Sequence, residues 1–348
     1  ALSGITITMT IDIHPDPNNA APTITDPTAV AASIAEIADG TTGETTADIV
    51  ASGSFTIADG DSDSVSVSVT SSSTTNSGNS VLGTLTPTVS NNTDDGAGVV
   101  TWSYAINDSH LDTMAVGDSF SETFTLTIDD GNGGTVTQDI VITVNGTNDA
   151  PVAQADSAAV AERQTINVAD GQDDDYTDPV TAGTSTGDVL HTAAGSHADS
   201  DVDGDTLRVS AIAPDGGETL AIASGASAQV NGAHGVLTMY GHGGYDYTAN
   251  RNVTSAGATE TDSFTYTVSD GDGGVSTGTI SVTVSAVNDA PVTPDDSATT
   301  AEDTSLSLDV LALASDIDSA SLTLQSVQGA GHGTVSLVAG QAVYVPEA

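Results

Sequence analysis

The sequence predicts an all-β protein made of tandem antiparallel β-sandwiches. The first observation is a stretch that occurs twice: residues 124–162 and 264–302 align without a gap and share 21 of 39 positions. The second is a period of two in the apolar residues, which is typical of strands with one buried face. The third is the scarcity of helix signals beside many short clusters of Gly, Asp, Asn and Thr, which favour turns.

Each copy of the repeated stretch predicts a β-hairpin. Alternating apolar residues flank a glycine tract, Asp-Gly-Asn-Gly-Gly at 130–134 and Asp-Gly-Asp-Gly-Gly at 270–274. Glycine readily adopts the positive φ angles that such tight turns need. Each hairpin runs into Asn-Asp-Ala-Pro, at 148–151 and at 288–291, where proline removes a donor and restrains its predecessor to extended geometry. The block therefore closes one domain and opens the next.

The repeat also predicts the domain boundaries, because Phe124 and Phe264 lie 140 residues apart. The predicted parts are the last strand and linker of a preceding repeat over 1–19, a sandwich over 20–149, a second sandwich over 150–289, and a third, too short to be whole, over 290–348. Residues 170–187 have no counterpart in the third unit and predict an acidic loop insertion in the second. We therefore expect a window from a longer tandem array.

The charge of the chain excludes several classes of partner. It has 48 Asp and Glu residues against three Arg and no Lys, which gives a formal net charge of −45. Such a surface repels phosphate backbones and anionic lipids, so we expect no nucleic-acid partner. No apolar run approaches the about 18 residues of a membrane span, so we expect no direct membrane insertion. Cysteine is absent, so neither disulfides nor thiolate metal sites can stabilise the fold.

An acidic turn stands before an alternating strand in each repeat. The three turns are Asp59-Gly60-Asp61-Ser62-Asp63, Asp201-Val202-Asp203-Gly204-Asp205 and Asp316-Ile317-Asp318. Carboxylates this close repel one another unless a cation lies among them, and the chain has too few basic residues to supply one. Hard oxygen ligands at this density suit Ca²⁺, which takes about 6 to 8 oxygens. The alternative is a solvated acidic turn.

Sandwich topology predicts which acids meet. In a seven-stranded sandwich, the loop between the second and third strands and the turn between the last two strands lie at the end where the preceding linker enters. We interpret the acidic turns as that loop and the Asp-Gly pairs at 130–131 and 270–271 as that turn, whereas the Glu that ends the first strand faces the next linker. The predicted metal ligands are Asp59, Asp61, Asp63 and Asp130 at the start of the first domain; Glu36, Asn148, Asp149, Asp201, Asp203, Asp205 and Asp270 at the first linker; Glu162, Asn288, Asp289, Asp316 and Asp318 at the second linker; and Glu302 beyond it. The alternatives are plain hairpin turns for Asp130 and Asp270, and turn capping for Asn148 and Asp149.

Most of the sequence resembles two kinds of bacterial repeat. Residues 101–151 resemble the VCBS repeat, and the rest resembles bacterial cadherin-like repeats. The Asn-Asp-Ala-Pro linker, the Ala-Glu pair that ends the first strand and the Asp-Val-Asp-Gly-Asp turn are similar to the inter-domain calcium ligands of that family. The resemblance implies immunoglobulin-like (cadherin-like) antiparallel β-sandwich domains in an elongated array.

The resemblance also implies a location and a role. Such repeats form the extender region of very large RTX-type adhesins on the bacterial cell surface, which are secreted through a type I system. Two departures stand out. Asn19-Ala20-Ala21-Pro22 lacks the linker Asp, and the glycine-rich nonapeptide of the RTX β-roll is absent.

We do not expect an enzyme. Residues 183–187 match the G-x-S-x-G expression, but a nucleophile elbow needs a strand before it and a helix after it, and this match lies in the acidic insertion. The histidines lack the spacing of a zinc site.

The sequence predicts a calcium-rigidified stalk that holds a distal binding domain away from the cell in adhesion or biofilm formation. Its partners would be neighbouring repeats of the same chain. One alternative is a module that binds a glycan or a protein through residues 170–187 or a surface around Tyr240, Tyr245 and Tyr247. Another is a filament in which residues 1–13 add a strand to a neighbouring copy.

Overall fold

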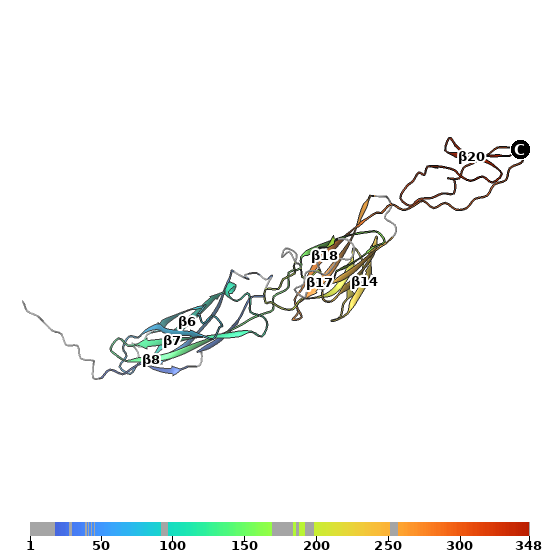
Figure 1. The fold of residues 1–348 in the computed structure, drawn as a ribbon. Helices are drawn as coiled ribbons and strands as arrows, with labels where there is room; N and C mark the ends of the chain where they lie inside the picture. The colour runs from blue at the N-terminus through green and yellow to red at the C-terminus, as the bar shows by residue number, and fades with distance from the viewer. Residues whose placement is uncertain are drawn as a thin grey trace, which may run out of the picture. The chain divides into compact units, whose positions relative to one another are not determined.

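The computed structural model describes residues 18–27, 30–38, 40, 42, 44, 46–91, 97–168, 184–185, 188–191, 198–250 and 257–347. The strand predicted near the N-terminus and most of the acidic insertion lie outside the described residues. The chain divides into two units. Figure 1 labels β6, β7 and β8 in the first unit and β14, β17, β18 and β20 in the second. The first comprises residues 1–150, 201–205 and 272–274, and the second comprises residues 151–200, 206–271 and 275–348.

The first unit is a sandwich of two four-stranded sheets. Its elements are β1 (Thr23–Asp26), β2 (Ala31–Ala35), β3 (Asp48–Ala58), β4 (Ser66–Thr74), β5 (Thr84–Asn91), β6 (Gly98–Asn107), the 3₁₀ turn η2 (Asp108–His110), β7 (Ser119–Asp129) and β8 (Thr135–Asn145). One sheet has the order β1-β3-β6-β5 and the other β2-β8-β7-β4. The sheets bury apolar residues from alternate positions of their strands, among them Trp102, Phe124, Leu126, Ile140 and Ile142.

The predicted hairpin of the first unit is confirmed. Strands β7 and β8 pair antiparallel along their whole length, with Phe124 opposite Ile140. The prediction of a purely antiparallel sandwich is incomplete, because β2 pairs parallel with β8, with Ala31 opposite Val141. The chain enters the first sheet as β1 and crosses to the second sheet as β2. In that second sheet, the last strand of the sandwich, β8, runs in the same direction as β2.

The second unit contains a larger sandwich and a separate small sheet. Its strands are β9 (Ala155–Ala161), β10 (Thr165–Val168), β11 (Thr184–Ser185), β12 (Arg208–Pro214), β13 (Leu220–Ala221), β14 (Ser227–Asn231), β15 (Gly235–Tyr240), β16 (Tyr245–Ala249), β17 (Thr259–Ser269), β18 (Val275–Ser285), β19 (Leu306–Leu308), β20 (Gly333–Val338) and β21 (Gln341–Pro346). The sandwich sheets have the orders β11-β9-β18-β17-β12-β13 and β10-β16-β15-β14. Strands β17 and β18 form the second predicted hairpin, and β9 pairs parallel with β18.

Residues 290–347 contain fewer strands than either sandwich. They contribute the three-stranded sheet β19-β21-β20, and Ala342 is their one buried apolar residue within the described range. The alternation of Leu322 and Leu324 with polar residues predicts a strand, but residues 321–330 form none. A strand needs a neighbour for its backbone donors and acceptors, and no strand of the described chain pairs with this segment. No helix in the described part of the chain is long and apolar enough to cross a membrane.

Candidate metal clusters

One hydrogen bond recurs wherever a linker meets an acidic turn. A backbone N–H of the linker donates to the second acid of the turn. The pairs are Ala20 to Asp61 Oδ2 at 2.7 Å, Asp149 to Asp203 Oδ2 at 2.9 Å, and Asp289 to Asp318 Oδ2. Each turn is also closed by an N–H of its second acid donating to Oδ1 of its first, at 3.2, 3.0 and 2.8 Å for Asp59, Asp201 and Asp316. At these three places a linker and an acidic turn are therefore in contact.

The first linker cluster lies in the first unit and comprises Glu36, Asp108, Asn148, Asp149, Asp201, Asp203 and Asp205. Carboxylate oxygens of Asp201, Asp203 and Asp205 all lie within 4.8 Å of one another. Calcium binds oxygens at about 2.3 to 2.6 Å, so two ligands on opposite sides of one ion lie about 5 Å apart. The three carboxylates are thus spaced to share a single ion.

Glu36 brings a fourth carboxylate to this cluster from the end of β2. Its side chain is buried, and its Oε2 atom accepts a hydrogen bond from the N–H of Thr147 at 3.0 Å. Burial raises the pKa of the Glu36 carboxyl to about 7, although the Thr147 bond lowers it. The nearby carboxylates of Asp149, Asp203 and Asp108 contribute to this raised pKa. Glu36 therefore lies in a concentrated negative field.

Buried oxygens without a hydrogen-bond donor test whether a cation fits these places. They include Glu36 Oε1 and Asp203 Oδ1 at the first linker, Asn19 Oδ1 and Asp59 Oδ2 at the start of the first sandwich, and Asp318 Oδ1 at the second linker. Leaving a buried acceptor unsatisfied costs about 1 to 3 kcal/mol, and more for a charged one. A hard divalent cation would satisfy several at once, and an all-oxygen set suits calcium better than a soft metal.

The N-terminal cluster comprises Asn19, Ala20, Asp59, Asp61, Asp63 and Asp130. Asp59 and Asp130 are buried, and Asn19 donates from Nδ2 to Asp130 Oδ2 at 3.1 Å. Burial, followed by the hydrogen bond with Asp61, raises the pKa of Asp59. Burial also acts on Asp130, but hydrogen bonds from Asn132, Asn19 and Gly134 outweigh it and hold its pKa below the usual range.

The second linker cluster, in the second unit, comprises Glu162, Arg163, Asn288, Asp289, Asp316 and Asp318. Glu162 is buried at the end of β9, and its N–H donates to Ser285 O at 2.9 Å. Arg163 Nη2 lies 3.8 Å from Glu162 Oε1, and its guanidinium also forms an ion pair with Asp289. An arginine is therefore part of this cluster, which the predicted ligand set did not include.

Two further predicted ligands differ in their burial. Asp270 is buried at the end of β17 in the second unit, and its role at the first linker stays a prediction. Glu302 is exposed, unlike Glu36 and Glu162.

Asp108 is a functional candidate that sequence reasoning missed. It begins η2, is fully buried, and accepts a hydrogen bond from the N–H of Ile37 at 2.9 Å. From the sequence, Asp108 to Val116 predict a helical turn or two after a capping Asp or Ser. The cap is in fact Asn107, which leaves the Asp108 carboxylate directed at the segment that follows Glu36.

A second group of buried acids is structural. Glu122 accepts a hydrogen bond from the Tyr104 hydroxyl at 2.9 Å, and Asp262 accepts one from the Tyr247 hydroxyl at 2.6 Å. Backbone N–H groups complete both sites, including Leu82 for Glu122 and Ala233 for Asp262. Glu122 and Asp262 are also 140 residues apart, so the repeat could have revealed them.

The second sandwich has a further buried acid pair around Tyr266. The Tyr266 hydroxyl lies 2.9 Å from Asp156 Oδ2 and 3.4 Å from Asp199 Oδ1. Burial, followed by the charges of Asp156 and Asp188, raises the pKa of Asp199 to about 7. Because the hydroxyl has one proton for two carboxyls, the pair is stabilised when Asp199 holds a proton of its own.

The surface predicted around the tyrosines of 240–247 is wrong for two of its three members. Tyr245 and Tyr247 are fully buried in the second core, where no partner can reach them. Tyr240 is half-buried and stacks on His242, with ring centroids 5.3 Å apart.

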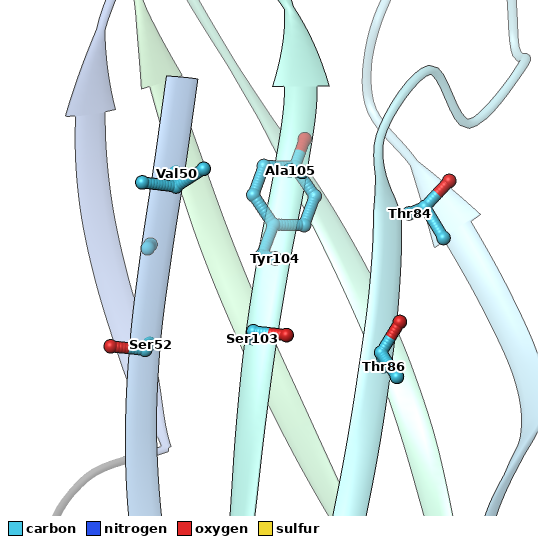
Figure 2. A pocket seen from close by; sticks show the side chains of 8 residues that line it. Val50, Ser52, Thr84, Thr86, Ser103, Tyr104 and Ala105 are labelled. Carbon is cyan, nitrogen blue, oxygen red and sulfur yellow. The ribbon is translucent and has the colours of Figure 1, made fainter. Parts of the chain in front are cut away.

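A depression of about 390 Å³ lies on the sheet that contains β3, β5 and β6, and Figure 2 shows the side chains that line it. Its lining side chains are Val50, Ala51, Ser52, Thr84, Thr86, Ser103, Tyr104 and Ala105. None is Asp, Glu, His, Lys or Arg. The Tyr104 hydroxyl donates to Glu122.

Comparisons with known proteins define the class of the domains. Residues 148–286 match the model of the bacterial cadherin-like domain, and residues 288–348 match that of the bacterial Ig domain. With the two sandwiches above, these matches identify a tandem of cadherin-like and immunoglobulin-like β domains. The resemblance of residues 101–151 to the VCBS repeat stays a prediction. No curated protein matches the chain.

Solved structures with some likeness include cadherin tandems. Mouse cadherin-23 domains EC22–24 align over 94% of this chain and 89% of that one, at 14% identity and a TM-score of 0.39. Protocadherin gamma B7 domains 1–4 align over 94% and 68%, at 14% identity and a TM-score of 0.38. Likenesses this distant do not bear on function.

Proposed function

We propose that the chain is a calcium-stiffened extender segment of a large RTX-type adhesin on the bacterial cell surface, secreted through a type I system. It would hold a distal binding domain away from the cell in adhesion or biofilm formation. Cadherin-like and Ig-like domains of bacteria indicate an extracellular surface protein of a structural or adhesive kind. The observation that carries the proposal is the linker N–H bonded to an acidic turn whose buried oxygens lack donors, such as Asp149 bonded to Asp203.

At the first linker, the residues that would hold the ion are Glu36, Asp149, Asp201, Asp203 and Asp205, with Asp108 beside them. Calcium, when bound, would supply the positive charge that neutralises these carboxylates. The chain itself holds the turn closed through the Asp203 N–H bond to Asp201, and holds the linker on the turn through the Asp149 N–H. Without a cation, six carboxylates repel one another and work against these two hydrogen bonds.

The expected energies are modest at one site and cumulative along an array. Extracellular calcium modules bind with a Kd of about 10⁻⁴ to 10⁻³ M. At ten times the Kd, one site adds about 1.4 kcal/mol to stability by mass action. Repeat arrays sum such nearest-neighbour contributions. Calcium should therefore change stiffness and protease resistance more than it changes the sandwiches.

X-ray scattering of the whole chain in calcium and in chelator tests the proposal. In calcium we expect the chain to sample a narrower range of shapes, which changes its maximum dimension, and we expect its melting temperature to rise. Magnesium at equal ionic strength is the control for general screening of charge. An unchanged maximum dimension together with an unchanged melting temperature would overturn the stiffening function.

A further inference from the structure

Arg163 lies where the acidic pattern alone would place a cation. The chain has only three basic side chains other than histidine, and one of them directly follows the buried Glu162. Its guanidinium contacts the Glu162 carboxylate and forms an ion pair with Asp289 of the linker. Asp289 in turn donates its N–H to Asp318 of the acidic turn. Arg163 thus contacts the Glu at the end of the strand and the Asp of the linker. The acidic turn is joined to them by the hydrogen bond from Asp289 to Asp318.

The first linker cluster has no such side chain at the same position. Glu36 and Glu162 both end the strand that pairs parallel with the last strand of their sandwich, and both bond by N–H to its final residue. The residue after Glu36 is Ile37, whose N–H donates to Asp108. Equivalent positions therefore hold an apolar residue in one cluster and a permanent cation in the other.

The chemistry of the guanidinium suits this place. Arginine stays charged at every pH of interest, and its planar fork matches carboxylates. The Arg163 side chain is 32% exposed, whereas those of Glu162 and Asp289 are 1% and 19% exposed. The positive group is therefore held against two carboxylates that are shielded from water, so the pairing is stronger than that of an exposed ion pair.

We propose that Arg163 is the built-in cation of the second linker cluster, which consequently takes up fewer calcium ions than the first. A calcium ion at Glu162 and Asp289 would have to displace the guanidinium or share its carboxylates against its positive charge. The second linker is then held partly without calcium, whereas the first depends on it. This inference rests on the proposed function, because it assumes that the first cluster binds calcium.

Calorimetric titration of the whole chain with calcium chloride tests it. We compare the natural chain with Arg163→Gln, which removes the charge, and Arg163→Lys, which keeps it. Arg208→Gln is the matched control, because it changes the net charge equally but lies on β12, where Arg208 donates to Ile222 O. We expect Arg163→Gln to bind roughly one more calcium ion per chain. Arg163→Lys and Arg208→Gln should bind the natural number.

The possible outcomes separate the two proposals. If the natural chain binds calcium and Arg163→Gln binds the same number with the same affinity, the role of Arg163 is overturned and the stiffening function stands. If no variant binds calcium, both are overturned. Hydrogen exchange of residues 286–290 in chelator gives a second readout that also shows whether each variant is folded. Arg163→Gln should exchange faster there than the natural chain and regain protection in calcium, and equal rates in chelator would count against the proposal.

Discussion

The backbone N–H of Asp149 donates to Asp203 Oδ2 at 2.9 Å, although the two residues are 54 positions apart. The same bond joins Ala20 to Asp61 and Asp289 to Asp318. A linker is therefore attached to an acidic turn by the backbone, whatever side chain the linker carries. The carboxylate that accepts the bond is also a candidate metal ligand, so cation binding and linker position are coupled.

Removing one charge at the first linker should weaken calcium binding. Asp203→Asn keeps the size and the acceptor oxygen but removes the negative charge. We expect about a tenfold loss of affinity, which corresponds to about 1.4 kcal/mol. Asp215→Asn, at an exposed turn position, is the matched control with the same change in net charge. Equal calcium affinity for the two variants would argue against Asp203 as a ligand.

An acid placed in the linker of the N-terminal cluster should strengthen calcium binding by that cluster. Ala20 occupies the position of Asp149 and Asp289, and it makes the same backbone bond. Ala20→Asp should therefore add a ligand and lower the calcium Kd of this cluster severalfold. Ala20→Asn has the same shape without the charge and should have a smaller effect. Titration calorimetry distinguishes them, and no gain for Ala20→Asp would show that this cluster lacks the geometry of the others.

The buried tyrosine–acid pairs should stabilise the sandwiches without calcium. Tyr247→Phe leaves the buried Asp262 with one donor fewer, so we expect about 1 to 3 kcal/mol lower stability. Tyr240→Phe is the control, because Tyr240 is only half-buried and bonds to Asp246. Denaturant unfolding in chelator gives the free energies. A loss for Tyr240→Phe as large as that for Tyr247→Phe would refute the burial argument.

The same tyrosines set the response to alkaline pH. Burial and then the neighbouring acids raise the pKa of Tyr104, Tyr247 and Tyr266. The unfolded chain loses these protons near the ordinary tyrosine pKa of about 10, while the folded chain retains them. Their contribution to stability is therefore complete below pH 10 and is lost as pH rises above it. Melting temperatures from pH 8 to 11 should fall above about pH 10, and less steeply for Tyr247→Phe.

The architecture follows from the sequence wherever a segment has two different faces. The alternation in β7, β8, β17 and β18 specified strands, and the glycine tracts specified their turns. The parallel pairing of β2 with β8 was not predictable from local pattern, because it depends on the sheet to which the chain crosses. The segment around Leu322 shows the reverse failure, since alternation without a neighbouring strand does not make a strand.

The candidate sites follow from the sequence only where they repeat. Linker and turn recur, so their meeting could be predicted from one unit and checked in the others. Asp108 and Arg163 do not recur, and their roles depend on neighbours far along the chain: Ile37 for Asp108, and Asp289 for Arg163. Glu122 and Asp262 do recur, but an acid in an alternating strand is indistinguishable from a solvent-facing residue until its tyrosine partner is known.

Hydrogen exchange at the first linker, with calcium and with chelator, tests the central claim most directly. The amides of residues 147–150 and 201–205 report whether the linker stays bonded to the acidic turn, and the β17–β18 hairpin serves as an internal reference. We predict that calcium slows exchange in the two segments by about tenfold or more while leaving the hairpin unchanged. Identical exchange of these segments in calcium and in chelator would contradict the account.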